Sequence, residues 1–434
     1  MTRRLFFTIS MVFLVAVCGI TTSLNAQWTR VPAPFGEQQV SGLFIDGSTM
    51  YIGTRDSGVY KSPDKGATWV AVRDGLPVIK HTSVLNPWCF ERSGEYLFAA
   101  SGEEGIYRSS DNGSSWTRVD RVIYDDTTVE ATKFRWVNSL YHSLGRIFAL
   151  GFDGIVSSSN NGDTWTTLSY RFGNVVGVTS AVSVGQDLYV SLYGDTTLYQ
   201  PPIFSSGIYK SSNLGEKWSK MNIGMPDGHI LSLATSDGYL YAGSKYGLSI
   251  SEDGGNSWVP VSMLRTIAGN VRTIAARNSI VLAGSIGGTI VRSFDYGATW
   301  STFMDGLVGA GSIRTIVLSG PGAYACTDKG LYALADITSA PDDAVQTDAT
   351  PKVVPQPTSS KVLIRCGRSV QSMNTRITDV LGNDVTNSVT ITGGNDDHSF
   401  NCDFSACPAG VYSVIPGSGS GAAITTAITV VVSR

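Results

Sequence analysis

The chain has 434 residues, of which 48 are glycine, 42% are hydrophobic and 15% are charged. This composition excludes a disordered protein and supplies enough apolar residues for two or three folded domains. The formal net charge of −3 argues against a nucleic-acid partner, and four histidines without a Cys-x-x-Cys pair argue against a zinc site. No glycine-rich phosphate-binding loop follows a strand-like segment, so we expect neither a metal nor a cofactor.

Residues 1–26 are predicted to form a secretory signal peptide. The basic tip MTRR precedes the apolar run LFFTISMVFLVAVCGI, which is shorter than the roughly 20 residues of a membrane span. Ala26 then supplies a small residue for cleavage, which would leave no membrane span in the mature chain. Two alternatives remain open: Cys18 is a lipoprotein acceptor, or the segment is an uncleaved anchor.

A similar octapeptide occurs six times between residues 62 and 300. The copies are SPDKGATW (62–69), SSDNGSSW (109–116), SSNNGDTW (158–165), SSNLGEKW (211–218), SEDGGNSW (251–258) and SFDYGATW (293–300). Successive copies are 40 to 53 residues apart, and only short strand-like segments with glycine breaks lie between them. Repeats of this length and texture predict a β-propeller with one four-stranded blade per repeat.

Each octapeptide is expected to form the hairpin turn between the third and fourth strands of a blade. The glycine allows the positive φ that the turn needs, and the Asp or Asn side chain accepts backbone hydrogen bonds. The tryptophan buries a large apolar surface against the neighbouring sheet. The residues assigned to these structural roles are Asp64, Gly66, Trp69, Asp111, Gly113, Trp116, Asn160, Gly162, Trp165, Asn213, Gly215, Trp218, Asp253, Gly255, Trp258, Asp295, Gly297 and Trp300.

The number of blades follows from the glycines that begin third strands. There are seven of them: Gly58, Gly105, Gly154, Gly207, Gly247, Gly288 and Gly330. The last unit lacks an octapeptide and a fourth strand. Residues 28–31 (WTRV) repeat residues 116–119 and precede any first strand, so we expect them to complete the seventh blade and close the ring. The propeller is therefore assigned to residues 27–337.

The octapeptide is identified as the Asp-box, or BNR repeat. Residues 28–335 resemble the propellers of sialidase-like and photosystem II assembly factor-like proteins. The resemblance implies an all-β, seven-bladed propeller in which the octapeptides are scaffold elements on the face opposite the usual binding funnel. It does not choose between an enzyme and a binding protein, because proteins that share a fold can differ in function.

The segment after residue 337 divides into a linker and a small β domain. Residues 338–360 carry several prolines and few large apolar residues and are predicted to be extended. Residues 361–434 return to strand-like segments, as expected for an Ig-like β-sandwich. Their motifs at Asp379–Gly382 and Pro408–Tyr412 resemble the C-terminal sorting domain of the type IX secretion system; an ordinary Ig-like adhesion module is the alternative. One disulfide can form among Cys366, Cys402 and Cys407, without a preferred pairing.

A catalytic function finds little support in the sequence. The Arg-Ile-Pro motif of sialidases is absent, and a glycosidase needs two carboxyl groups that face each other across the substrate. Acidic residues on loops between second and third strands are usually solvated surface charges. Candidates of this kind are Asp56, Glu103, Glu104, Asp153 and Asp328, and none is assigned as catalytic.

Alignment of the inner strands places one residue of each blade at the same level of the central funnel. These residues are Ser41, Thr82, Arg135, Thr179, Leu231, Arg272 and Arg314. Like charges at one level repel each other. Either nearby carboxylates pair with the arginines and brace the channel, or Arg135, Arg272 and Arg314 bind a carboxylate or sulfate through bidentate contacts.

Together these features predict a secreted or cell-surface, non-enzymatic propeller that binds a protein or an extracellular glycan. A sialidase-like or glucanase-like glycoside hydrolase is the alternative. The expected partners are the type IX secretion machinery and a protein or acidic glycan at the propeller face. The expected location is the outer surface, or the surroundings, of a Gram-negative bacterium.

Overall fold

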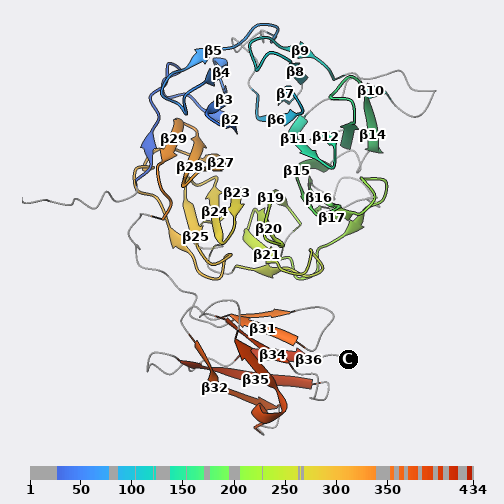
Figure 1. Ribbon diagram of the computed structural model, residues 1–434, viewed down its shortest axis with the longest axis vertical. Helices are drawn as coiled ribbons and strands as arrows, with labels where there is room; N and C mark the ends of the chain where they lie inside the picture. Colours follow the sequence, from blue (N-terminus) through green and yellow to red (C-terminus); the bar gives the residue numbers. More distant parts are fainter. Residues whose placement is uncertain are drawn as a thin grey trace, which may run out of the picture.

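The computed structural model consists almost entirely of β-strands (Figure 1). It describes residues 27–77, 87–102, 104–120, 122–123, 137–152, 154–170, 176–194, 206–226, 228–261, 264, 268–338, 352–355, 361–365, 370–379, 384–393, 399–403, 410–418 and 428–432. The predicted signal peptide lies outside these residues. Among them, no helix is long and apolar enough to cross a membrane.

Seven sheets follow one another around a ring and form the seven blades of a β-propeller, which confirms the predicted fold class (Figure 1). Six blades run from the innermost to the outermost strand in chain order. Their strands are β2 (Val40–Asp46), β3 (Thr49–Thr54), β4 (Gly58–Ser62) and β5 (Val70–Ala71); β6 (Cys89–Ser93), β7 (Tyr96–Ser101), β8 (Gly105–Ser109) and β9 (Thr117–Arg118); β11 (Val137–Ser143), β12 (Arg146–Gly151), β13 (Gly154–Ser158) and β14 (Trp165–Tyr170); β15 (Val176–Val184), β16 (Asp187–Gly194), β17 (Gly207–Ser211) and β18 (Ser219–Lys220); β19 (Ile230–Ser236), β20 (Tyr239–Ser244), β21 (Gly247–Ser251) and β22 (Val259–Pro260); and β23 (Val271–Arg277), β24 (Ile280–Ser285), β25 (Ile290–Ser293) and β26 (Ser301–Thr302).

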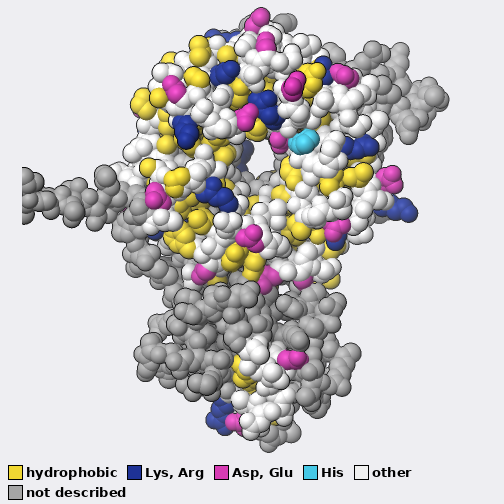
Figure 2. Space-filling view, in the orientation of Figure 1, with side chains coloured by type: hydrophobic (Ala, Val, Ile, Leu, Met, Phe, Trp, Pro, Cys, Tyr) yellow, Lys and Arg dark blue, Asp and Glu magenta, His cyan; other side chains and the backbone are white. Residues whose placement is uncertain are grey.

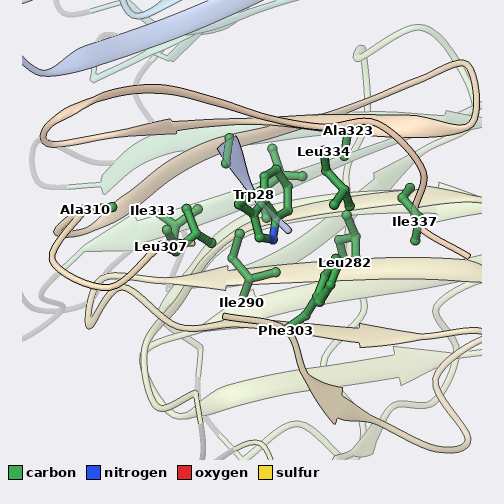
Figure 3. Packing of buried hydrophobic residues seen from close by; sticks show 12 residues of the cluster. Trp28, Leu282, Ile290, Phe303, Leu307, Ala310, Ile313, Ala323, Leu334 and Ile337 are labelled. Atoms are coloured by element: carbon green, nitrogen blue, oxygen red, sulfur yellow. The ribbon is translucent and has the colours of Figure 1, made fainter. Parts of the chain in front are cut away.

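The seventh blade joins the two ends of the propeller. Its first three strands, from the centre outwards, are β27 (Ile313–Ser319), β28 (Gly322–Thr327) and β29 (Gly330–Leu334), and its outer strand is the N-terminal β1 (Thr29–Arg30). β1 pairs antiparallel with β29. Trp28, which is 1% exposed, enters the apolar cluster between the sixth and seventh blades and contacts Phe303 there (Figure 3).

The hydrophobic cores lie between neighbouring blades. Side chains alternate between the two faces of each strand, so every sheet offers apolar residues to both of its neighbours. Tyr51 and Val59 of the first blade, for example, pack in one cluster with Leu97 and Trp116 of the second. Each blade therefore depends on the next for burial, and closing the ring covers the faces that the first and last blades would otherwise expose.

The octapeptides form the turns between third and fourth strands. In the first copy, the Ser62 hydroxyl accepts the Gly66 N–H at 2.8 Å, and the Asp64 carboxylate accepts the N–H and the hydroxyl of Thr68 at 2.8 and 2.6 Å. The same serine–glycine bond recurs in all six copies at 2.7–2.8 Å. Where asparagine replaces aspartate, as at Asn160, the side-chain oxygen accepts the equivalent N–H at 3.0 Å.

The octapeptides also hold neighbouring blades together. A tyrosine on the second strand of one blade donates its hydroxyl to a backbone carbonyl in the octapeptide of the next blade. The pairs are Tyr51 to Asn112 (3.0 Å), Tyr189 to Gly254 (2.8 Å), Tyr241 to Tyr296 (3.2 Å) and Tyr324 to Lys65 (3.3 Å). Four of the seven blade junctions are thus fastened by the same type of bond, the last of them across the ring closure.

A second fastening follows the outer strands. The segment after the outer strand of one blade runs beside the outer strand of the next blade. The backbone N–H of the tryptophan that precedes this next outer strand donates to a backbone carbonyl in the segment, as in Trp116 to Asp74 and Trp28 to Asp305, both at 2.9 Å. Between the second and third blades this contact is a short parallel strand, β10 (Val122–Ile123), paired with β14. Gly75 (φ +79°) lies in the corresponding segment after β5, between the first and second blades, and a Cβ there would be 1.9 Å from the Trp116 carbonyl oxygen.

The C-terminal residues form two further sheets. One has the order β30 (Lys352–Pro355), β31 (Lys361–Arg365), β34 (Ser399–Asp403) and β33 (Thr390–Gly393), and the other β32 (Val370–Asp379), β35 (Gly410–Ser418) and β36 (Ile428–Val432). β30 corrects the predicted linker, because it lies within residues 338–360 yet pairs with β31. A proline is tolerated at the end of such an edge strand, so proline content alone was misleading. Cys402 is a buried free thiol, whereas Cys366 and Cys407 lie outside the described residues.

Candidate functional site

The centre of the ring is open, and charged side chains surround the opening on the face shown in Figure 2. The inner strands of neighbouring blades contact each other around this centre. They enclose a cavity of about 800 Å³, a size typical of ligand sites. Residues of all seven blades line this cavity.

A β-bulge near the start of the inner strand positions one residue of each blade in the cavity wall. In six blades the register with the second strand shifts directly after a buried valine or isoleucine. The bulge leaves one residue of the inner strand without a partner opposite it on the second strand. These residues are Ser41, Asn138, Thr179, Leu231, Arg272 and Arg314, and all of them line the cavity.

The structure therefore brings together five of the seven residues that were aligned at one funnel level. Thr82 and Arg135 lie outside the described residues, and the equivalent positions belong to Trp88 in the second blade and Asn138 in the third. The inner strands of these blades begin at Cys89 and Val137, later than the alignment assumed.

A third arginine lines the cavity from a loop, outside the inner strands that were aligned. Arg55 follows β3, in the loop that leads to the third strand of the first blade, and it shares the cavity wall with Arg272 and Arg314. We refer to Arg55, Arg272 and Arg314 as the arginine cluster. They belong to the first, sixth and seventh blades, which are adjacent in the closed ring. A search of the loops between second and third strands for basic as well as acidic residues would have found Arg55.

The members of the cluster differ in how their charge is balanced. Arg314 donates from Nε to Asp328 Oδ1 at 2.6 Å, and Asp328 Oδ2 accepts the Ser312 N–H at 3.0 Å. Burial alone would raise the pKa of Asp328, but the Ser312 amide and the Arg314 guanidinium outweigh it and lower the pKa below its ordinary value. Arg314 is thus braced by a carboxylate.

Arg272 has no hydrogen-bond or ion-pair partner within the described part of the chain. Its side chain is exposed to the channel, but the surrounding wall and the Arg314 guanidinium both lower the pKa of Arg272. Asp328 offsets this only weakly, through space. A guanidinium without a partner beside another positive charge is electrostatically unfavourable, and an anion from outside would relieve it.

A smaller hollow of about 400 Å³ opens between the first and seventh blades. Asp56 and Asp328 line it together with Arg55 and Arg314. Two of the five acidic candidates from the sequence thus meet at one place. Glu104 lines neither hollow, and Glu103 and Asp153 lie outside the described residues.

The octapeptides lie away from this site. Neighbouring strands in a blade run antiparallel, so the turns between third and fourth strands are at the end of the blade opposite the start of the inner strand. The residues assigned to them, from Asp64 to Trp300, therefore belong to the scaffold side of the molecule. Among the described residues, no group of three or more His, Cys, Asp or Glu side chains is arranged to hold a metal ion.

Comparisons with known proteins agree with this architecture. Residues 352–430 match a family described as the secretion system C-terminal sorting domain. No curated protein matches the chain. Among solved structures, YCF48 bound to a D1 peptide is 15% identical, with a TM-score of 0.53 over 73% of this chain and 97% of that one. YCF48 from Cyanidioschyzon merolae is 17% identical, with a TM-score of 0.52 over 71% and 99%.

A GH74 xyloglucanase from Xanthomonas campestris is also similar, at 14% identity and a TM-score of 0.53 over 80% of this chain and 60% of that one. At such identities the likeness shows the fold alone. The chain is a seven-bladed β-propeller that carries, at residues 352–430, a secretion system C-terminal sorting domain.

Proposed function

We propose that this chain is a secreted or cell-surface, non-enzymatic binding protein, and that its propeller takes an anionic group of an extracellular ligand into the channel at the arginine cluster. One observation carries the proposal. The described residues that line the channel cavity include three arginines and neither aspartate nor glutamate. Cavity walls of one charge attract ligands of the opposite charge and raise their rate of association.

The unpaired state of Arg272 favours ligand binding over bracing. If the arginines served only to brace the channel, each would be expected to have a carboxylate partner, as Arg314 has in Asp328. A guanidinium that lacks one can make paired, charge-assisted hydrogen bonds to a carboxylate or sulfate from outside. Similar propellers include YCF48 bound to a D1 peptide and a xyloglucanase, which is consistent with peptides and sugars as ligands of this fold.

The sorting domain supports the proposed location. We expect the chain to leave the cytoplasm through its N-terminal signal peptide and to cross the outer membrane of a Gram-negative bacterium through the type IX secretion system, which recognises residues 352–430. The ligand would then be met at the cell surface or in the medium. An envelope protein or an extracellular polymer fits that location.

A glycoside hydrolase is the second candidate, because Asp56 and Asp328 line the same hollow. A glycosidase needs one carboxyl group that stays protonated near neutral pH, so its pKa must be raised. The pKa of Asp328 is instead lowered, and the group is held by Arg314. Chromogenic glycosides, including uronides, test this candidate directly. Turnover that is lost in Asp56→Asn and Asp328→Asn would replace the binding proposal.

The proposal is tested by titrating the full-length protein with polyglutamate and polygalacturonate at low ionic strength. Arg272→Gln should weaken binding of the retained polyanion about tenfold, the loss expected for hydrogen bonds to a charged group. Arg277→Gln is the matched control, since Arg277 lies at the other end of β23 and donates to the Gly320 carbonyl.

Thermal unfolding distinguishes an arginine that binds a ligand from one that stabilises the channel. Arg272→Gln should leave the melting temperature unchanged or raise it, because it removes a repulsive charge, whereas Arg314→Gln should lower it by leaving Asp328 unpaired. The proposal is wrong if neither polyanion is retained by the wild type, or if Arg272→Gln unfolds as readily as Arg314→Gln.

A further inference from the structure

Large apolar side chains gather on the rim of the channel. Trp88, Phe152, Tyr193, Tyr246 and Ile286 are 40%, 47%, 41%, 45% and 40% exposed, and they are five of the nine large apolar residues that are exposed on the described propeller. Each lies at the start of an inner strand, at the end of a second strand or in the loop that follows it. Single exposed apolar residues need no explanation, but a set of them on one rim marks a binding surface.

These side chains are continuous with the channel cavity. Trp88 and Ile286 line the cavity itself. A Cβ on Gly177 would lie 3.2 Å from the Phe152 ring and 3.3 Å from the amide nitrogen of Asn138, so Phe152 borders a bulge residue of the wall.

Tyr193 and Tyr246 extend the rim to the fourth and fifth blades. The Tyr193 ring makes an edge-to-face contact with the ring of His229, with 5.3 Å between the ring centroids, and His229 directly precedes inner strand β19. The His229 carbonyl accepts the backbone N–H of Lys245, the residue before Tyr246. We call Trp88, Phe152, Tyr193 and Tyr246 the aromatic arc. The arc occupies the second to fifth blades, and the arginine cluster occupies the sixth, seventh and first.

We infer that the ligand of this channel is an acidic polysaccharide, a polymer of uronic acid or sulfated sugars. Its sugar rings pack on the aromatic arc, and its anionic groups pair with the arginine cluster. This inference rests on the proposed function and specifies its ligand. A pyranose ring offers an apolar C–H face to an aromatic ring while its hydroxyls stay hydrated, so separate exposed rings along a rim suit a repeating chain. Carboxylate or sulfate groups on the same chain suit planar guanidinium donors.

The wall between the rings favours a sugar over an acidic peptide. The bulge residues there include Ser41, Asn138 and Thr179. The Ser41 hydroxyl accepts from Gln39, and Asn138 Nδ2 and the Thr179 hydroxyl donate to the Val178 and Ile230 carbonyls. The Ser41 hydroxyl can still donate and the Asn138 amide oxygen can still accept, which suits the donors and acceptors of sugar hydroxyls. Peptides anchor through apolar side chains in desolvated pockets. The apolar residues deeper in the channel, such as Leu43 (8% exposed) and Phe90 (6% exposed), are almost fully covered by packing between blades and offer no such pocket.

The test uses the full-length protein and three polymers of matched length: polygalacturonate, polyglutamate and uncharged dextran. Affinity is measured by calorimetric titration for the wild type and for Trp88→Ala, Phe152→Ala and Arg272→Gln. Val70→Ser is the matched control, because Val70 is 58% exposed on the outer strand β5, away from the rim. We expect polygalacturonate to bind best, dextran not to bind, each ring variant to weaken binding about five- to tenfold, and Val70→Ser to have no effect.

The outcomes separate this inference from the proposed function. If Arg272→Gln weakens polygalacturonate binding but neither ring variant does, the anionic site stands and the polysaccharide inference is wrong. Equal or tighter binding of polyglutamate also overturns the polysaccharide inference and identifies an acidic peptide as the ligand. If neither polyanion binds, or if dextran binds as tightly as polygalacturonate, the proposed anionic site fails and the inference fails with it.

Discussion

Trp28 offers the sharpest test of how the ring is closed. The residue is 1% exposed and packs against Phe303 and its neighbours, so Trp28→Ala leaves a large cavity at the junction of the first and last strands of the propeller (Figure 3). Truncation of a buried tryptophan costs about 3–5 kcal/mol. The buried indole N–H of Trp28, however, has no hydrogen-bond partner among the described residues, and removing such a donor recovers about 1–3 kcal/mol. We therefore expect a net loss of about 2–3 kcal/mol.

Trp165 provides the comparison. It is equally buried, but its indole N–H donates to the Val119 carbonyl at 2.6 Å. Trp165→Ala therefore loses a satisfied bond as well as packing, and it should cost about 1–2 kcal/mol more than Trp28→Ala. Trp28→Phe keeps most of the packing and removes the unpaired donor, so it should cost less than about 1.5 kcal/mol.

The assay is urea unfolding of the full-length protein followed by tryptophan fluorescence. All nine tryptophans lie in the predicted propeller, within residues 28–300, so the signal does not report on the C-terminal domain. Linear extrapolation gives the free energy of unfolding for each variant. A loss below about 1 kcal/mol for Trp28→Ala would show that the N-terminal strand does not close the ring, and equal losses for Trp28→Ala and Trp165→Ala would refute the argument about the unpaired indole.

Three further predictions concern the scaffold and the tail. Gly75→Ala should destabilise the propeller by several kcal/mol in the same urea assay, because the new Cβ would be 1.9 Å from the Trp116 carbonyl oxygen. Gly238 has a similar positive φ but no atom within 4 Å of a Cβ, so Gly238→Ala should cost only about 1 kcal/mol. Hydrogen bonds from the Ser115 hydroxyl and amide lower the pKa of Asp111 to about 2 in the folded protein. The ionised Asp111 carboxylate therefore contributes its full stabilisation above the unfolded-state pKa of ~3.9, and this contribution is lost as the pH falls towards 2. Asp111→Asn should flatten the acid-unfolding curve in that pH window. Deletion of residues 352–434 should leave the propeller folded but retained in the periplasm, and normal amounts in the medium would contradict a sorting role.

The octapeptides show why the fold was predictable from sequence. Their glycine, aspartate or asparagine, and tryptophan each meet a local need of the turn, so the residue types themselves reveal the geometry. Two features of the turn were missed. The first serine accepts the glycine N–H in every copy, and the residue before the glycine also has positive φ, for example Lys65 at 57° and Leu214 at 58°. The second feature leaves only a partial signal. Asparagine or glycine, which tolerate positive φ, occupies the position in three copies, but lysine, leucine and tyrosine occupy it in the others, where the turn overrides their preference.

The site was harder to predict because it depends on register. A sequence pattern did exist: a buried apolar residue, then a variable residue, a small or hydroxyl residue and another apolar residue begin the inner strands, as in Val137-Asn138-Ser139-Leu140. In the second blade the same positions read Pro87-Trp88-Cys89-Phe90, in which the proline and tryptophan hide the pattern, so the alignment moved to Thr82.

The variable residue of this pattern is the one that the bulge frees from the ladder. Strand pairing does not depend on its side chain. Asn138 and Thr179 use theirs to donate to carbonyls of the next blade, but a serine, a leucine or an arginine occupies the same position in other blades of the same fold. The residues that line the channel are thus the ones that the rules for strands and turns constrain least. For this reason the repeat predicts the propeller but not its ligand, and the ligand has to be inferred from what these positions hold in this chain: an arginine cluster on one side of the rim and exposed rings on the other.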